Sequence, residues 1–154
     1  MSRAFVKDAD DTFDELPDRP VSPHPNLVTP EGLAAIEATL TRLHEDYAAA
    51  QASGDRAGLA MAARDLRYWT ARRASAQLVA APASPDTVHF GSTVTILRDD
   101  GSRQTWRIVG EDEAEPARGT ISYVSPVARA LMGKTVGEVV RAGHSDAEIV
   151  DIVI

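Results

Sequence analysis

The sequence predicts an α+β protein in which an antiparallel helical hairpin, a short coiled coil, precedes a small antiparallel β domain with one short helix. Apolar residues recur at spacings of three and four through residues 29–81, which is typical of packed helices. From residue 88 the spacing changes to two and β-branched residues become frequent, as in strands. Residues 82–87 contain two prolines and form the expected linker, so the β domain covers residues 88–154.

Residues 1–28 precede the hairpin and are acidic and rich in proline. They hold six acidic and three basic side chains, and Pro17, Pro20, Pro23 and Pro25 interrupt both helices and sheets. A segment of this composition cannot bury a hydrophobic core. We therefore expect residues 1–28 to be a disordered or extended tail.

Two apolar stripes joined by a short turn predict the hairpin. Thr29 is suited to cap the first helix, which has Pro30 at its first position and continues to about Ala52. The turn at residues 53–55 separates the stripes, and Asp55 is expected to cap a second helix that reaches residue 80. Tyr47 and Trp69 lie on the stripes and should pack between the helices.

The β domain is predicted from short alternating segments separated by turn residues. Strands are expected at residues 88–90, 93–98, 103–109, 120–124, 136–141 and 148–154. Residues 99–102 form the turn of a hairpin, and residues 111–118 form an acidic loop. Ser125 and Pro126 should begin a short helix that ends near Met132.

Composition excludes several classes of site. The chain has no cysteine, so it forms neither disulfides nor thiolate metal sites, and this fits the reducing cytoplasm where we place it. Its four histidines are scattered, which argues against a built-in zinc site. No apolar run is long enough for a membrane helix or a signal peptide. The net charge of −7 gives no general attraction to nucleic acid.

Several motifs over residues 27–154, taken together, are specific. They are Val28-Thr29-Pro30-Glu31-Gly32-Leu33, Phe90-Gly91-Ser92-Thr93-Val94-Thr95, Arg107-Ile108-Val109-Gly110-Glu111-Asp112-Glu113-Ala114 and Ile121-Ser122-Tyr123-Val124-Ser125-Pro126-Val127-Ala128-Arg129-Ala130-Leu131-Met132-Gly133-Lys134. With these motifs the chain resembles the bacterial Gre transcription elongation factors.

The resemblance implies an FKBP-like β domain that grips the rim of the secondary channel of bacterial RNA polymerase, while the hairpin enters the channel. The docking residues it implies are Asp112, Glu113, Ser125, Pro126, Ala128, Arg129 and Leu131. On the hairpin we expect contact with polymerase, or indirectly with RNA, through Arg56, Arg64 and Arg67, and the resemblance implies this role for Arg64. A solvated helix face is the simpler interpretation. We expect no membrane association and a monomeric free protein.

Family members carry two acids at the tip, an Asp and a Glu three residues later, which help polymerase to hold a second Mg²⁺ for cleavage of backtracked RNA. Here Asp55 is present, but the later position is Gly58. Both arms also look shorter than is usual in the family, by about 10–15 Å.

We therefore expect a regulator that modulates or occludes polymerase rather than strongly stimulating cleavage. It would not itself be an enzyme and would have no cofactor of its own. One alternative is a cleavage factor in which Asp55 shares Mg²⁺ with polymerase. Another is an FKBP-like protein-interaction module outside transcription.

Overall fold

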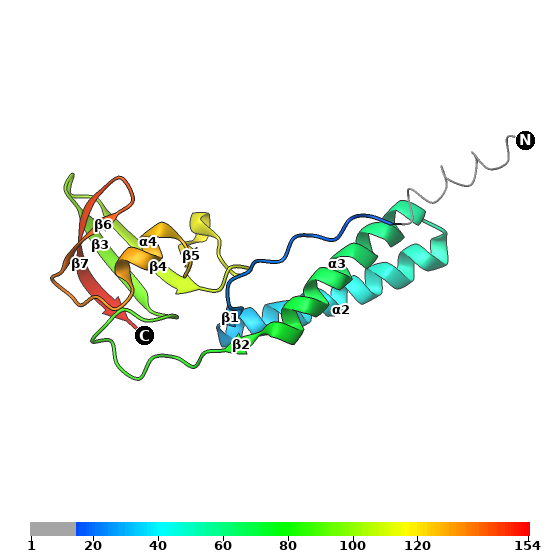
Figure 1. The fold of residues 1–154 in the computed structure, drawn as a ribbon, viewed down its shortest axis with the longest axis horizontal. Coiled ribbons are helices and arrows are strands. Elements are labelled where there is room, and N and C mark those ends of the chain that lie inside the picture. The colour runs from blue at the N-terminus through cyan, green and yellow to red at the C-terminus, as the bar shows by residue number, and fades with distance from the viewer. Residues whose placement is uncertain (1–14) are drawn as a thin grey trace, which may run out of the picture. The chain divides into compact units, whose positions relative to one another are not determined.

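The computed structural model describes residues 15–154, which divide into two compact units. Among the described residues, the hairpin unit contains residues 15–23 and 34–75, and the sheet unit contains residues 24–33 and 76–154. Figure 1 shows a pair of long helices in one unit and a curved sheet with a short helix in the other. The predicted fold class is therefore confirmed.

The helical hairpin consists of α2 (Pro30–Ser53) and α3 (Arg56–Ser75). Ile36, Leu43 and Ala50 are buried along α2 at intervals of seven residues, as the stripe predicts for a coiled-coil seam. At the turn, Gly54 has a φ of 69°, and the N–H of Asp55 donates to the carbonyl of Ala50 at 2.9 Å. Glycine suits this left-handed conformation, so the turn closes without backbone strain.

The second helix ends at Ser75, earlier than the predicted residue 80. Beyond it, β2 (Gln77–Leu78) pairs in parallel with β1 (Leu27–Val28). The N–H of Gln77 donates to Asn26 at 2.8 Å, and that of Val79 donates to Val28 at 3.0 Å. The prediction was wrong here because pairing with a segment distant in sequence satisfies these backbone groups, so they do not continue the helix.

The sheet unit is built on five strands in the order β5-β4-β3-β7-β6. Their bounds are β3 Thr93–Arg98, β4 Arg103–Val109, β5 Thr120–Ser122, β6 Val139–Ala142 and β7 Ser145–Val153. Every pair is antiparallel except β4 and β5, which are parallel. The connection between them includes the 3₁₀ helix η1 (Pro116–Arg118). Residues 88–90, predicted as a strand, form none.

The core of the sheet unit lies between the sheet and α4 (Pro126–Leu131). Alternate residues of the strands point into it, and the most deeply buried include Val94, Ile96, Ile108 and Ile149. Ala128 and Leu131 contribute the inner face of α4, and both are 0% exposed. The short helix is thus fixed by burial of its apolar side chains.

Residues 15–23 form neither helix nor strand but lie beside α3, as Figure 1 shows. The sequence left a disordered or an extended tail open, and residues 15–23 make specific contacts with α3. The part of the predicted tail over residues 1–14 lies outside the described residues. Among residues 15–154, no helix is long and apolar enough to cross a membrane.

Candidate functional site

The tip of the hairpin places Asp55 at the start of α3, where it is exposed. Its Oδ1 accepts a hydrogen bond from the backbone N–H of Gly58 at 3.0 Å. This is the N-cap contact that the sequence predicts, and it satisfies one of the donors left open at a helix start. The carboxylate of the tip is thus engaged with its own helix.

Gly58 stands where the resemblance places a second acid. A Cβ atom at this position would overlap the Asp55 carboxylate, contacting Oδ2 and lying 2.9 Å from Cγ. A side chain at residue 58 would therefore require the Asp55 carboxylate to shift from the position it occupies here. The Asp55 carboxylate lies in the space that a side chain at residue 58 would occupy, so the glycine and the cap fit each other.

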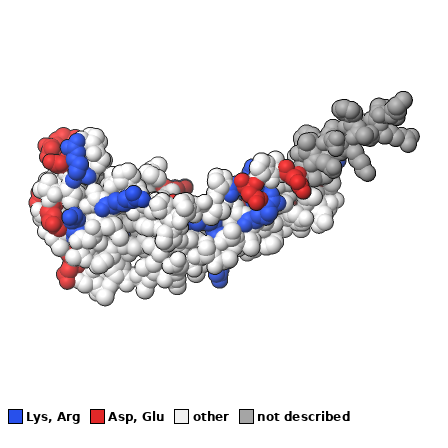
Figure 2. All heavy atoms as spheres, viewed as in Figure 1, with Lys and Arg blue, Asp and Glu red and all other residues white. Residues whose placement is uncertain are grey.

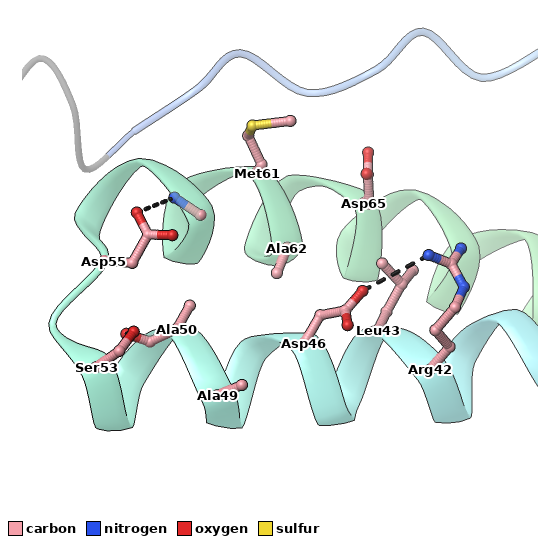
Figure 3. A pocket seen from close by; sticks show the side chains of 11 residues that line it. Arg42, Leu43, Asp46, Ala49, Ala50, Ser53, Asp55, Met61, Ala62 and Asp65 are labelled. Carbon is pink, nitrogen blue, oxygen red and sulfur yellow. Dashed lines mark hydrogen bonds and ion pairs between the residues drawn. The ribbon is translucent and has the colours of Figure 1, made fainter.

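A groove of about 590 Å³ lies between the two helices near the tip (Figure 3). Small residues form its floor, among them Ala50 and Ala62, and three carboxylates stand around it, on Asp46, Asp55 and Asp65. Asp46 pairs with Arg42 at 3.6 Å on the surface of α2. Within residues 15–154, no three His, Cys, Asp or Glu side chains are grouped closely enough to hold a metal ion. The groove therefore carries acidic charge without a preformed metal site.

The arginines predicted to contact polymerase or RNA all lie on α3, but their surroundings differ. Arg56 is exposed in the first turn. Arg64 is half-buried, and its Nε lies 3.5 Å from Oδ1 of Asp65. Arg67 is exposed and binds the N-terminal segment, with Nε donating to Asp18 at 2.6 Å. Basic and acidic side chains are intermixed over the hairpin on the face shown in Figure 2.

The two acids predicted to dock a partner lie in the acidic loop of the sheet unit and have different surroundings. Asp112 is half-buried and has an interaction partner within the chain. Glu113 accepts hydrogen bonds from the hydroxyl of Thr29, at 2.6 Å and 2.9 Å to its two oxygens. The same hydroxyl oxygen accepts from the N–H of Gly32 at 2.9 Å, so Thr29 caps α2 as predicted. Glu113 therefore supports the first turn of α2.

Glu31, in the same turn, pairs with Arg107 of β4 at 3.3 Å. A hydrogen bond from its own backbone N–H, followed by the hydrogen bond and charge of Arg107, lowers the pKa of Glu31 below its ordinary value of 4.5. An acid at this point also favours the positive end of α2. Two contacts thus fix the beginning of α2: Arg107 pairs with Glu31, and Glu113 accepts from Thr29.

The predicted docking residues of α4 fall into two groups. Ser125 caps the helix by accepting from the N–H of Ala128 at 3.3 Å. Pro126 and Arg129 are exposed and are available to a partner. Ala128 and Leu131 are fully buried in the core, so the prediction that they contact a docked protein does not fit this conformation. Their matching sequence reflects packing of α4 on the sheet.

Sequence reasoning missed the role of Asp18 and Arg19. These residues lie in a segment that composition assigns to a tail, yet they bind Arg67, Asp65 and the ring of Tyr68. The only signal was the alternation of charge and proline in Pro17-Asp18-Arg19-Pro20. That pattern has no period that would point to a contact with a helix.

The second half of the chain is similar to known proteins. Residues 82–153 match the family model described as transcription elongation factor, GreA/GreB, C-terminal. Transcription elongation factor GreA of Rhodopseudomonas palustris is 50% identical over 68 residues, which cover 42% of this chain and 43% of that protein. GreB of Neisseria meningitidis is 40% identical over 96 residues, 58% of each protein. The chain spans about half the length of the curated relatives it matches.

Solved structures give a weaker likeness. GreA factor homolog 1 of Thermus thermophilus superposes with a TM-score of 0.43 and 20% identity, over 85% of this chain and 100% of that one. A GreA/GreB elongation factor from Nitrosomonas europaea gives a TM-score of 0.41 and 19% identity, over 83% of this chain and 98% of that one.

Proposed function

We propose that the chain is a Gre-type transcription regulator that binds bacterial RNA polymerase, because residues 82–153 match the GreA/GreB C-terminal family model. The sheet unit docks on polymerase through the exposed residues Pro126 and Arg129 and the acidic loop, and the hairpin enters the secondary channel. The protein acts through polymerase and is not itself an enzyme.

We further propose that it modulates or occludes polymerase rather than strongly stimulating transcript cleavage. The arrangement at the tip supports this. The Asp55 carboxylate caps α3 through Gly58, and residue 58 has no side chain to supply a second ligand. A divalent cation held only loosely by polymerase needs additional hard oxygen ligands. One carboxylate already bound to its own helix is a poor source of them.

The cleavage assay uses stalled, backtracked transcription complexes. Wild-type protein should slow elongation without increasing the rate of RNA cleavage. Asp55→Asn is the informative variant, because asparagine caps a helix about as well as aspartate but carries no charge. It should inhibit as strongly as the wild type. Asp46→Asn, which removes another exposed carboxylate of the groove, is the matched control.

The alternatives predict different results. If the wild type accelerates cleavage and Asp55→Asn abolishes the acceleration, the chain is a cleavage factor that shares Mg²⁺ with polymerase through Asp55; the exposure of this residue at the tip favours that second candidate. Pull-down with core polymerase, competed by an established Gre factor, tests the partner. Failure to bind would assign the β domain to protein interactions outside transcription.

A further inference from the structure

A short segment of the N-terminus, residues 16–20, covers one side of α3; we call it the strap. Its contacts centre on two arginines, one on each partner. Arg67 of α3 donates to the Asp18 carboxylate at 2.6 Å and to the carbonyl of Leu16 at 3.0 Å. Arg19 of the strap lies 3.4 Å from Asp65 of α3. In one ion pair the arginine belongs to α3, and in the other it belongs to the strap. Only one direction and register of the strap on the helix satisfies both pairs.

An aromatic pair on α3 completes the surface beneath the strap. Tyr68 and Trp69 meet edge to face, with ring centroids 5.1 Å apart. The guanidinium carbon of Arg19 lies 4.0 Å from the Tyr68 centroid and 5.8 Å from the Trp69 centroid. This is the geometry of a cation–π contact. Tyr68 and Trp69 are only half-buried, so the strap covers rings that the helical seam does not enclose.

The strap needs little change of backbone conformation to bind α3. Pro17 and Pro20 flank the Asp18-Arg19 pair and restrict the backbone to extended conformations. Less conformational entropy is then lost when the segment docks. Its hold is nevertheless weak, because the side chains of Asp18 and Arg67 remain 75% and 48% exposed. Exposed ion pairs contribute little individually and are screened by salt.

We propose that the strap is an intramolecular competitor, which occupies Arg67 and the aromatic pair of α3 and must leave before polymerase contacts this side of the hairpin. The inference rests on the proposed function, since it regulates the same hairpin. Arg67 is one of the residues predicted to touch polymerase or RNA, and here its guanidinium is already taken by Asp18 and Leu16. In the free protein the Asp18 carboxylate binds Arg67, as an acidic or phosphate-bearing surface would bind it in the complex.

The expected size of the effect follows from the contacts. One exposed ion pair, one half-buried ion pair and one cation–π contact of ordinary strength favour the closed strap over the open one by about tenfold. A ligand that binds only the open form then has its apparent dissociation constant raised by about the same factor. Releasing the strap should therefore increase the affinity for polymerase about tenfold.

Strap closure can be measured without any partner. The chain has two tryptophans, so a Trp106→Phe background leaves Trp69 as the single fluorescent indole. In that background the double variant Asp18→Ala/Arg19→Ala should make Trp69 more accessible to acrylamide quenching. Added salt should raise the quenching of the unreleased protein towards that of the variant. Arg42→Ala/Asp46→Ala removes an exposed ion pair of 3.6 Å on α2 and should change nothing. Equal quenching of the released and unreleased proteins would overturn the proposal.

Competition is then measured as the affinity of the full-length chain for core RNA polymerase. The released variant should bind about tenfold more tightly than the wild type, and the control pair equally. Adding Arg67→Ala to the released variant should abolish the gain. If wild type binds and the released variant binds equally or more weakly, the strap proposal is wrong while the proposed function stands. If neither protein binds polymerase, the proposed function is wrong, and the proposal that the strap competes with polymerase is wrong as well.

Discussion

The Asp55 carboxylate stabilises the hairpin as a helix cap, and it is also the tip residue for which the family resemblance implies metal binding. It accepts the N–H of Gly58, and the missing side chain at residue 58 leaves the space in which it lies. A free carboxylate at a helix start would be a better metal ligand, but α3 would then lose its cap. A single residue therefore serves stability at the place where the family resemblance implies catalysis.

Replacing Asp55 by alanine should lower the free energy of unfolding by about 1 kcal/mol, which is the usual cost of losing an N-cap. Asp55→Asn should cost much less, because the amide oxygen accepts the same hydrogen bond. Urea denaturation followed by circular dichroism measures both. Equal destabilisation by the two variants would mean that the charge, rather than the cap, stabilises the tip.

The junction between β1, α2 and the acidic loop shows how elements constrain one another. The Thr29 hydroxyl links the cap of α2 to Glu113, and a Cβ on Gly32 would lie 2.5 Å from Oε2 of the same carboxylate. Gly110 approaches even more closely, since a Cβ there would overlap the carbonyl oxygen of Leu27. These contacts explain why small or acidic residues are needed in segments that resemble the Gre motifs, independently of any docking role.

The Glu31–Arg107 pair gives this junction a pH dependence. The pKa of Glu31 is lowered in the folded protein, so its contribution to stability is present above the glutamate value of 4.5 and is lost as the pH falls below it. Glu31→Gln should therefore reduce stability at neutral pH and flatten the acid side of the stability profile. Denaturant titrations at several pH values measure this.

Asp100 and Glu138 also have lowered pKa values, through hydrogen bonds from Ser102 and Thr135 respectively. Both persist in the Glu31→Gln variant, so the difference between the two profiles isolates Glu31. Parallel profiles at all pH values would show that the pair with Arg107 does not stabilise the protein.

At the scale of the whole molecule, the two units bury very different cores. The sheet unit encloses a cluster that includes Ile96, Ile108 and Ile149, all 0% exposed. Buried apolar residues of the hairpin unit are fewer and smaller, with Ile36 and Leu43 the largest. Local stability follows the density of such contacts. The hairpin should therefore open more readily than the sheet.

Amide hydrogen exchange should show faster exchange in α2 and α3 than in β3, β4 and β7. The substitution Ile149→Val, which typically costs about 0.5–1.5 kcal/mol, should accelerate exchange in the sheet and leave α3 unchanged. Slower exchange in α3 than in β3, or acceleration of both by Ile149→Val, would contradict separate opening of the units.

What the sequence determined by itself was local. The caps at Thr29, Asp55 and Ser125 and the seam at Ile36, Leu43 and Ala50 depend on residues three to seven positions apart, so their patterns could be recognised directly. The motifs of the β domain added the resemblance to the Gre factors, because they combine several such local requirements.

The tertiary structure alone decided the features that join distant segments. Pairing of β1 with β2 ended α3 at Ser75, and packing on the sheet turned Ala128 and Leu131 into core residues. Contacts with Arg67 and Tyr68 turned a proline-rich tail into a strap. Each of these depends on a partner in another element of the chain, which no local period encodes. Composition could describe residues 1–28 as acidic and rich in proline, but only the folded hairpin supplies the surface to which the strap binds.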